Sequence, residues 1–453
     1  MIRKKTLLLL LSLLAAISFP MFSSRVAAAD FAQGVSVSGS TATIWFKSNV
    51  GTTWVDVHYK LNGGVQQNLR MTYSSANARY EQAVSGVASG NSLQYLFTYN
   101  NGNPAYDTAT YTYTIGGGGS GGGGGSGSGI GSVPASSIPT PPNNGSVSLK
   151  VMNGTGGAYA DSQIYWGVIG INPANGAWSY LDLNGNLLPI SNALNDASGH
   201  LTKNGQNYAN IYHTVSAASW VNLPKITSGR MFLCVGTPCY IKTYNDGFAG
   251  PDINNPSDPN RNIYFDFIEF TVDNTGYHGN TTRVDGFGFP VQHRLVNKAG
   301  NFDRTVGELE SETRSGLFAK YQNEVPTAFK SLATVQAPYR IVAPIHGSFA
   351  VGGANANYFA GYSGYSTQDI LRCDGSLTDA SACAAINRHV YTTGNWNNVA
   401  NYYNAAPANY YAKFWHDHSI DHLAYGFAYD DVNGQAAYLE VGDPKGLIIR
   451  VGW

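Results

Sequence analysis

The segment from Asp30 to Ile115 alternates between apolar and polar positions, as a β-strand does when one of its faces is buried. Val55, Val57, Tyr59 and Leu61 follow this pattern and lead into Asn62-Gly-Gly, a hairpin turn signal. The other alternating runs are 35–37 and 41–46, which a Ser-Gly-Ser turn joins, 93–99 and 111–115. Six to eight short strands at this spacing predict a β-sandwich.

From residue 146 onward the pattern begins as strands and later takes helical spacing. Strands are predicted over 147–151, 164–171 and 178–183, the last followed by the turn sequence Asn-Gly-Asn. Thr305 and Glu308 have the spacing of a capping box, which predicts a helix that ends before Pro326. Further helices are predicted over 377–389 and 409–422. The pattern therefore predicts a β-rich subdomain and one of mixed α and β structure.

Composition separates these two parts of the chain. Twelve of the sixteen residues from Gly116 to Gly131 are glycine, and four prolines follow between 134 and 142. Such a segment forms a flexible linker with a stiffer end. We therefore predict a module over 30–115, a linker over 116–145 and a larger region over 146–453.

The N-terminus has the pattern of an export signal. Arg3, Lys4 and Lys5 precede the apolar run 7–19, and small residues at 27 and 29 precede Asp30. The apolar run is shorter than the roughly 20 residues of a membrane span. We therefore predict a signal peptide over 1–29, its cleavage, and a secreted, extracellular protein.

The charge of the chain indicates which kinds of binding partner are excluded. Charged residues make up only 12 % of the chain and apolar residues 43 %, against about 25 % charged residues in typical soluble domains. Cleavage would remove four basic residues and no acidic one, which changes the formal net charge from −1 to −5. This charge argues against electrostatic binding to nucleic acid or anionic membranes. An uncharged polysaccharide is the natural partner, and we expect a monomer.

Four cysteines in an oxidising compartment can pair in three ways. Cys234 and Cys239 are five positions apart, and Cys373 and Cys383 are ten apart, so we favour these two local disulfides. Free thiols or another pairing are the alternatives. Two cysteines in each cluster without a second close ligand argue against zinc, and we expect no metal.

The predicted module carries many aromatic residues, while its acidic residues are too scattered to form a catalytic pair. Sugar rings stack on exposed Trp and Tyr rings. The candidates are Trp54, Tyr73 and Tyr106, with burial in the core or on a strand as the alternative for each. The pattern over 30–115 resembles carbohydrate-binding module family 56, whose members bind β-1,3-glucan, and this resemblance implies the same partner here.

Two carboxyl groups lie in contrasting surroundings further along. In the predicted strand 264–272, alternation places Asp266 on one face and Glu269 on the other, together with Phe265, Phe267 and Thr271. A carboxyl among phenylalanine rings is desolvated, which favours the neutral form that a general acid needs. Asp285 follows in a more polar segment. Such a pair is typical of glycosidases; an ordinary ion pair between Glu269 and Arg283 is the alternative.

At these residues the sequence resembles glycoside hydrolase family 64, the secreted endo-β-1,3-glucanases that release laminaripentaose. The matching stretches are 254–260, 265–271 with Glu269, 280–288 with Asp285, and 414–431. The resemblance implies that Glu269 is the general acid and Asp285 the general base of an inverting mechanism. It also implies a β-rich, barrel-like subdomain and a mixed α/β, thaumatin-like subdomain with a broad groove between them.

The resemblance further implies glucan contacts beside the two acids, at Thr271 and Thr282. Asp273 and His278 are also predicted to contact substrate, although the family has Asn and Trp at these two positions. In the stretch 414–431, Asp430 and Asp431 are predicted to bind sugar hydroxyls or the backbone. Trp415 is predicted to stack on a sugar, with core burial as the alternative.

Two other clusters of ionisable residues could indicate a different catalytic site or a metal site. Glu308, Glu310 and Glu312 resemble the Glu-x-Asp-x-x-Glu signature of a retaining β-1,3-glucanase family, but the central Asp is missing and helix capping accounts for Glu308. The histidines between His416 and His422 look like metal ligands, but no third ligand is fixed by the sequence. A helix that lines a groove or the core explains them better.

These features predict a secreted, inverting endo-β-1,3-glucanase acting on glucan of the curdlan, laminarin or fungal-wall type. It needs no cofactor, because hydrolysis requires only an acid, a base and a positioned substrate. The alternative is a non-catalytic, thaumatin-like protein that binds β-glucan or cell walls.

The pattern also bears on the distance between the carboxyl groups of Glu269 and Asp285. A hairpin centred on Tyr277 would place Glu269 directly opposite Asp285, with Cβ atoms about 4.5–5.5 Å apart. Retaining enzymes have such a short spacing, whereas inverting enzymes need about 6.5–9.5 Å between carboxyl groups. We predict a shifted register and the wider separation.

Overall fold

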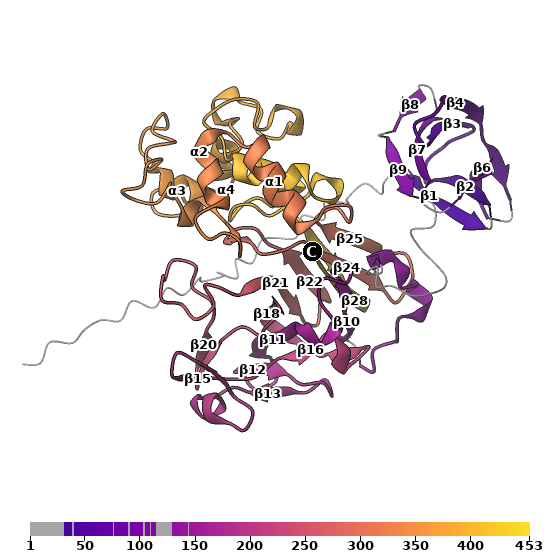
Figure 1. The fold of residues 1–453 in the computed structure, drawn as a ribbon. Coiled ribbons are helices and arrows are strands. Elements are labelled where there is room, and N and C mark those ends of the chain that lie inside the picture. Colours follow the sequence, from indigo (N-terminus) through magenta and orange to yellow (C-terminus); the bar gives the residue numbers. More distant parts are fainter. Residues whose placement is uncertain are drawn as a thin grey trace, which may run out of the picture. The chain divides into compact units, whose positions relative to one another are not determined.

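The computed structural model describes residues 31–38, 40–75, 77–88, 91–102, 105–108, 110–114, 129–143 and 145–453. The predicted signal peptide and most of the glycine-rich segment lie outside these residues. The chain divides into two compact units, residues 1–119 and 120–453, and each is described by itself (Figure 1). None of the helices in the described ranges is long and apolar enough to span a membrane.

The first unit contains two antiparallel sheets, with the strand orders β1-β2-β6-β5 and β4-β3-β7-β8, and β9 also pairs with β7. The strands are β1 (Phe31–Ser38), β2 (Thr41–Ser48), β3 (Val55–Leu61), β4 (Gln67–Arg70), β5 (Thr72–Ser74), β6 (Arg79–Ser85), β7 (Ser92–Asn100), β8 (Ala105–Asp107) and β9 (Tyr111–Thr114). Their inner faces share one core, which includes Ile44, Phe46, Val57 and Phe97. The predicted sandwich and its first two hairpins are confirmed.

The second unit is built on two larger sheets. The smaller has the order β17-β10-β28-β24-β25, and the larger has the order β13-β12-β11-β18-β21-β22-β27, with β16 pairing with β11. The smaller sheet consists of β10 (Val147–Gly154), β17 (Val221–Leu223), β24 (Val291–Asn297), β25 (Asp303–Gly307) and β28 (Pro444–Gly452). The larger consists of β11 (Ile164–Asn172), β12 (Ala177–Leu181), β13 (Leu187–Pro189), β16 (His213–Thr214), β18 (Ile226–Val235), β21 (Tyr264–Val272), β22 (Tyr277–Thr281) and β27 (Tyr438–Val441).

These two sheets pack face to face across one core. Leu149 and Leu447 of the smaller sheet share it with Leu233 and Ile268 of the larger. The other face of the larger sheet is covered in part by a second core, built around Phe232 and the segments 209–211 and 239–241. The two-stranded ribbons β14 (Leu201–Lys203) with β15 (Gln206–Tyr208) and β19 (Lys242–Tyr244) with β20 (Gly247–Ala249) belong to this part of the chain. Further along, the same face carries half-exposed polar side chains.

The remainder of the second unit is helical. Its helices are α1 (Arg314–Glu324), α2 (Thr327–Lys330), α3 (Thr367–Arg372), α4 (Ala380–Asn387) and α5 (Tyr410–Asp417). They surround a core with Tyr321, Phe329 and Trp415 at its centre. The chain enters this core through β23 (Gly286–Phe287), which pairs with β26 (Ile341–Val342). In Figure 1 these orange and yellow helices lie together beside the sheets.

The first predicted helix begins later than expected. Residues 303–307 form β25, and α1 begins after Thr313, whose hydroxyl accepts a hydrogen bond from the Gly316 amide at 3.0 Å. The capping box at Thr305 and Glu308 is therefore wrong, because Glu308 is buried and binds Arg283 instead. The helix ends before Pro326 as predicted, and α4 and α5 lie within the other two predicted helical ranges.

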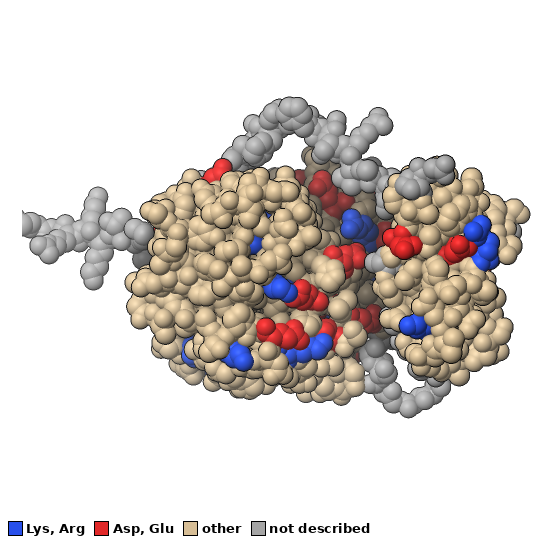
Figure 2. Space-filling model, turned by 90° about the horizontal axis from the view of Figure 1, so that it is seen from above, with Lys and Arg blue, Asp and Glu red and all other residues tan. Residues whose placement is uncertain are grey.

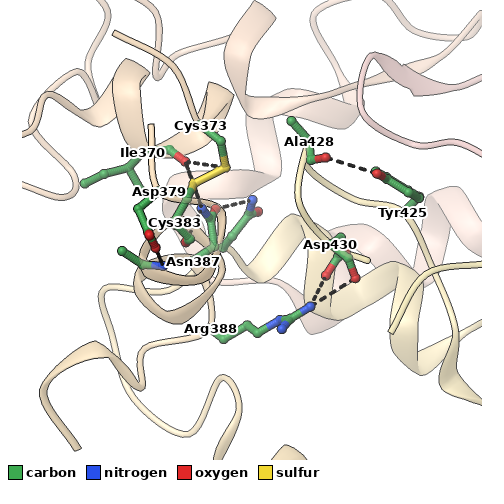
Figure 3. The surroundings of a disulfide bond; sticks show 11 residues. Ile370, Cys373, Asp379, Cys383, Asn387, Arg388, Tyr425, Ala428 and Asp430 are labelled. Atoms are coloured by element: carbon green, nitrogen blue, oxygen red, sulfur yellow. Dashed lines mark hydrogen bonds and ion pairs between the residues drawn. A yellow bond between two sulfur atoms is a disulfide. The ribbon is translucent and has the colours of Figure 1, made fainter. Parts of the chain in front are cut away.

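Both predicted disulfides are present, Cys234–Cys239 and Cys373–Cys383. Figure 3 shows the second, which joins the end of α3 to α4. Asp379 caps α4 by accepting a hydrogen bond from the Ala382 amide at 2.6 Å. The local pairing expected from the cysteine spacing is thus confirmed.

The proline-containing end of the predicted linker is packed against the second unit. Ile130 and Ile138 share a small core with Ile448. Arg294 donates hydrogen bonds to the carbonyls of Ile130 and Val133, at 3.1 and 2.7 Å. Residues 129–143 therefore belong structurally to the larger region. The reason is that the isoleucines of this segment pack against its apolar surface, which a purely polar linker would not do.

Candidate active site

Strand β21 carries the predicted acid on the open face of the larger sheet. Ile268, Phe270 and Val272 point into the core between the sheets, whereas Glu269 and Thr271 alternate with them and are half exposed. The face assignment made from the sequence is therefore confirmed.

The return strand β22 fixes the register of this hairpin. It places Asn280 opposite Glu269 and His278 opposite Thr271. The turn is Asp273–Gly276, where Gly276 has a φ of +126° and lies so close to Val441 that a Cβ would sit 2.0 Å from its carbonyl oxygen. Only glycine fits such a position. The hairpin is therefore not centred on Tyr277, and Asp285 does not stand opposite Glu269, which agrees with the predicted shift of register. The wider separation of the two carboxyl groups stays a prediction.

Glu269 is not enclosed by its phenylalanine neighbours. Its side chain keeps 43 % of its surface exposed, and Oε1 lies 2.5 Å from Nη2 of Arg230, which stands opposite on β18. The Arg230 guanidinium also packs over the Phe267 ring, 4.4 Å from its centroid. The predicted desolvation of Glu269 is wrong in this arrangement, because a cation occupies the place where apolar surroundings were expected.

Asp285 lies in the segment that leads from β22 into the helical core. Its Oδ1 is 3.4 Å from Nε2 of His346, and Nδ1 of His346 is 2.9 Å from Oδ1 of Asn254. Burial acts to raise the pKa of Asp285, but the hydrogen bond to His346 and the electrostatic effects of His346 and Arg230 outweigh it and lower the pKa. Asp285 is therefore ionised at neutral pH, as a general base must be.

A cleft of about 170 Å³ brings Asp285 and His346 together with Arg230, the partner of Glu269. Its walls are formed by Arg230, Phe232, Phe265, Phe267, Asp285, His346 and the segment 251–253. Glu269 follows Phe267 by two positions on the same strand face and binds Arg230, so Arg230 is a common neighbour of Glu269 and Asp285. Neither Arg230 nor His346 was predicted from the sequence. Arg230 could have been noticed as a charged residue directly before the apolar run 231–235.

A buried ion network holds the segment that carries Asp285. Arg283 is 2 % exposed and donates to both carboxylate oxygens of Asp266 at 2.9 Å and to those of Glu308 at 2.6 and 2.8 Å. Asp266 also accepts from the Gly288 amide, and the Tyr411 hydroxyl donates to the Arg283 carbonyl at 2.6 Å. Asp285 is thus anchored on both sides. The alternative pairing of Arg283 with Glu269 is wrong.

The polar face continues from Glu269 toward the turn. His278 lies opposite Thr271, and its ring contacts the hydroxyls of Thr275 at 2.7 Å and Tyr438 at 3.1 Å. Asp273 accepts from the Thr275 amide at 2.7 Å. These side chains line one surface that begins at the acid, so Thr271, Asp273 and His278 remain predicted substrate contacts.

Two of the predicted substrate contacts are buried instead. Trp415 is 0 % exposed and stacks on Phe287 at 4.6 Å between ring centroids. Asp430 is also 0 % exposed, and binds Arg388 and His416 at 3.0 Å each (Figure 3 shows the Arg388 pair). Sugar contact at these two positions is therefore wrong, because both side chains fill the helical core. The alternatives hold instead: Trp415 is buried in the core, and Asp430 binds the backbone by accepting a hydrogen bond from the Gly426 amide at 2.8 Å.

Thr282 and Asp431 differ in accessibility. Thr282 is 4 % exposed and accepts a hydrogen bond from the Val284 amide at 3.3 Å, whereas Asp431 is exposed. Substrate contact at these two positions stays a prediction.

The histidines near α5 have protein partners. His416 contacts the His422 carbonyl and Asp430, and His418 lies 2.9 Å from Glu312 and 2.8 Å from Glu324. Within the described part of the chain, no group of three His, Cys, Asp or Glu side chains is arranged to hold a metal ion.

The candidate aromatic residues of the first unit are accessible to different extents. Tyr73 is 54 % exposed and Tyr106 is 45 % exposed. Trp54 is half-buried, and the Arg70 guanidinium lies 4.6 Å from its ring centroid. They lie on or beside strands β3, β5 and β8.

Comparison with known families decides the identity of the larger region. The sequence model of glycoside hydrolase family 64, described as beta-1,3-glucanase, matches residues 145–370 and 363–451. The chain belongs to this family. Carbohydrate-binding module family 56 matches residues 33–108. The family 64 region is thus joined to a carbohydrate-binding module, as the sequence resemblance implied.

Relatives of known structure agree with this assignment. A family 64 laminaripentaose-producing beta-1,3-glucanase from Paenibacillus barengoltzii, complexed with laminarihexaose, is 69 % identical, with a TM-score of 0.71 over 94 % of this chain and 100 % of that one. A beta-1,3-glucanase domain from Clostridium beijerinckii is 38 % identical, with a TM-score of 0.65 over 69 % of this chain and 100 % of that one.

A curated relative is more distant. The glucan endo-1,3-beta-glucosidase of Cellulosimicrobium cellulans is 26 % identical over 294 residues, which cover 51 % of this chain and 53 % of the relative. The chain thus spans about half the length of this relative. The shared part supports classification as a glycoside hydrolase.

Proposed function

We propose that this chain is a secreted, inverting endo-β-1,3-glucanase that releases short laminari-oligosaccharides such as laminaripentaose. The observation that carries the proposal is that Arg230, which binds Glu269, lines the same cleft as Asp285. The named activities of the relatives from P. barengoltzii and C. beijerinckii support the same substrate. In this proposal the two sheets correspond to the barrel-like subdomain, the helical part to the thaumatin-like one, and the cleft to part of the groove between them.

In the proposed reaction Glu269 donates a proton to the glycosidic oxygen while Asp285 removes a proton from the attacking water. The C1–oxygen bond to the leaving sugar breaks as the bond from C1 to the water oxygen forms. The low pKa of Asp285 suits the base. Glu269 contacts Arg230 through Oε1, at the open face of the sheet.

The register of the hairpin supports inversion. Asn280 occupies the position opposite Glu269, and Asp285 follows five residues later, beyond the end of β22. The short separation of directly opposed residues, which would suit a retaining enzyme, therefore does not apply. NMR of the first product formed from laminarin tests this: we expect the α-anomer to appear first, and an initial β-anomer would contradict inversion.

The catalytic assignment is tested by release of reducing sugar from curdlan. We expect Glu269→Gln and Asp285→Asn each to lower kcat by at least about 1000-fold, since each removes one of the two groups that move protons. Asp374→Asn, at an exposed ion pair in the helical part, serves as the matched control and should keep wild-type activity. If wild-type protein pellets with curdlan but releases no sugar, a non-catalytic glucan-binding protein is the correct description.

We also propose that the first unit binds β-1,3-glucan through Trp54, Tyr73 and Tyr106. The match to family 56 and the exposure of the two tyrosines support this proposal.

A further inference from the structure

Strand β27 continues the row of side chains that contains Glu269 to the last strand of the larger sheet. Glu269 stands opposite Arg230 of β18 and Asn280 of β22. Asn280 stands in turn opposite Tyr438 of β27. Directly paired residues of neighbouring strands point to the same face of a sheet, so these four side chains share the open face. Leu439, the next residue along β27, is buried in the core between the sheets, as this alternation requires.

Tyr438 presents an accessible aromatic ring on this open face. It is 40 % exposed, whereas Phe267, on the same face of β21, lies against the Arg230 guanidinium. Neighbouring strands of a sheet lie about 4.8 Å apart, so the Cα atom of Tyr438, two strands from β21, is about 10 Å from that of Glu269. A glucan chain bound at Glu269 would therefore place a neighbouring sugar at Tyr438, and not the bond that breaks.

Two polar neighbours hold Tyr438 by its hydroxyl. This hydroxyl donates a hydrogen bond to Oε2 of Glu440 at 3.0 Å and lies 3.1 Å from Nδ1 of His278. Nε2 of His278 lies 2.7 Å from the Thr275 hydroxyl, at the turn between β21 and β22. Because the hydroxyl already has two partners, the ring is the part of Tyr438 that is left for a ligand. A side chain that is held in place before the ligand arrives loses little conformational freedom on binding.

The groups around the ring suit an uncharged sugar. Sugar rings stack their C–H faces on aromatic rings, and carboxylate oxygens accept hydrogen bonds from hydroxyls. The carboxyl groups of Asp273 and Glu440 are accessible and lie 3.8 and 3.5 Å from the His278 ring. An exposed ring beside two carboxylates therefore fits a hydroxyl-rich, neutral polymer, and it disfavours a polyanionic one.

We propose that Tyr438 is a substrate-binding residue on which a sugar ring next to the reacting one stacks, while His278 and Glu440 orient it. This inference rests on the proposed function, since it places the glucan along the row that begins at Arg230 and Glu269. The substrate-binding surface then extends beyond the cleft walls, across β22 to β27.

The test measures kcat and KM for laminarihexaose with wild type, Tyr438→Ala and Tyr438→Phe. Loss of binding energy that the substrate complex and the transition state share raises KM and leaves kcat nearly unchanged. We expect Tyr438→Ala to raise KM roughly tenfold, with kcat within about twofold of wild type. Tyr438→Phe keeps the ring and loses only the bonds that orient it, so KM should rise by no more than about threefold.

Tyr244→Ala is the matched control, because Tyr244 is 43 % exposed on β19, outside this row, and the variant should keep the wild-type KM. Calorimetric titration with laminarihexaose gives a second readout, in Glu269→Gln and in the double variant Glu269→Gln with Tyr438→Ala. The affinity should fall by the same factor as KM rises, and the first unit is identical in both proteins.

An unchanged KM in Tyr438→Ala, or an equal rise in Tyr438→Phe, would overturn the inference. A loss of kcat without a change in KM would also overturn it, because a stacking contact with a neighbouring sugar acts through binding. Failure of the proposed function is distinguishable, since it would appear as a wild type that releases no sugar. The calorimetric comparison would then still report whether Tyr438 binds the oligosaccharide.

Discussion

Strand β21 presents one carboxylate to an arginine on each of its two faces, and the two sites differ in accessibility. On the inner face Asp266 binds Arg283 in a network whose side chains are 3 % and 4 % exposed. On the outer face Glu269 binds Arg230, with side-chain exposures of 43 % and 36 %. Arg283 uses all three guanidinium nitrogens, whereas Arg230 is bound to Glu269 through one.

The two ion pairs differ in what they do for the site: the buried network fixes the backbone near Asp285, and the exposed pair lies on the open face of the sheet. The buried network fixes the backbone on either side of Asp285, because Asp266 binds the Gly288 amide and Glu308 binds the Val291 amide as well as Arg283. Burial acts to lower the pKa of Arg283, but its two carboxylate partners raise it above its ordinary value. The pair on the outer face is half exposed and is formed through one guanidinium nitrogen. Asp285 therefore follows a segment that buried ion pairs hold in place, whereas Glu269 belongs to a half-exposed pair.

The largest effect on stability is expected from Arg283→Met. Removal of one partner from a buried ion network leaves uncompensated charge and costs about 3–5 kcal/mol, and here both Asp266 and Glu308 would lose their cation. Urea unfolding should show this loss of free energy at pH 7.

Arg230→Met is the matched comparison, and should change the free energy of unfolding by less than about 1 kcal/mol, because its ion pair is half exposed. Equal destabilisation by the two variants would contradict the distinction between the two faces. The triple variant Asp266→Asn, Arg283→Met and Glu308→Gln should recover part of the lost stability, since it leaves no unpaired charge.

A smaller, pH-dependent effect is expected at a second buried network, around Asp430. Burial acts to lower the pKa of His416, but the charge of Asp430 and the hydrogen bonds to Asp430 and the His422 carbonyl raise it overall above the ordinary value of 6.5. A raised pKa in the folded protein gives stability that is present below pH 6.5 and is lost as the pH rises through the folded-state value. The melting temperature should therefore fall by a few degrees above pH 6.5.

His416→Gln should flatten this decline, while Asp430 keeps Arg388 as its partner. Scanning calorimetry between pH 6 and 9 makes the measurement. A decline of the same size in the variant would show that another group is responsible.

The sequence predicted strands and faces more reliably than partners. The alternation in β21 correctly assigned Glu269 and Asp266 to opposite faces because side-chain direction follows from local geometry alone. The register with β22 depends on the close approach of Gly276 to Val441, more than 160 residues away in the chain, which no local pattern encodes. Arg230 was missed and Glu308 was misread for the same reason, since their partners come from other segments of the chain.

Trp415 and Asp430 illustrate a further limit. Both residue types suit a sugar-binding site, and both lie in the stretch that resembles the family. Their burial depends on how the segment 410–430 packs on Phe287 and Arg388. Chemistry alone could not distinguish a core ion pair from a ligand contact.

The smallest effect is expected when the first unit is removed. In its described residues the Arg–carboxylate pairs, Arg70–Asp56 and Arg79–Glu81, lie at the surface of the module, unlike the network of Arg283. Deletion of residues 30–115 removes none of the residues on either face of β21. We therefore expect kcat/KM on soluble laminarin to be unchanged.

On insoluble curdlan the same deletion should lower the initial rate several-fold. A tethered binding module raises the local concentration of enzyme at a surface without changing the barrier to hydrolysis. Tyr73→Ala combined with Tyr106→Ala in the full chain should reproduce this loss if these exposed rings carry the binding. An equal loss on laminarin and curdlan would instead show that the module completes the cleft or supports the fold of the larger region.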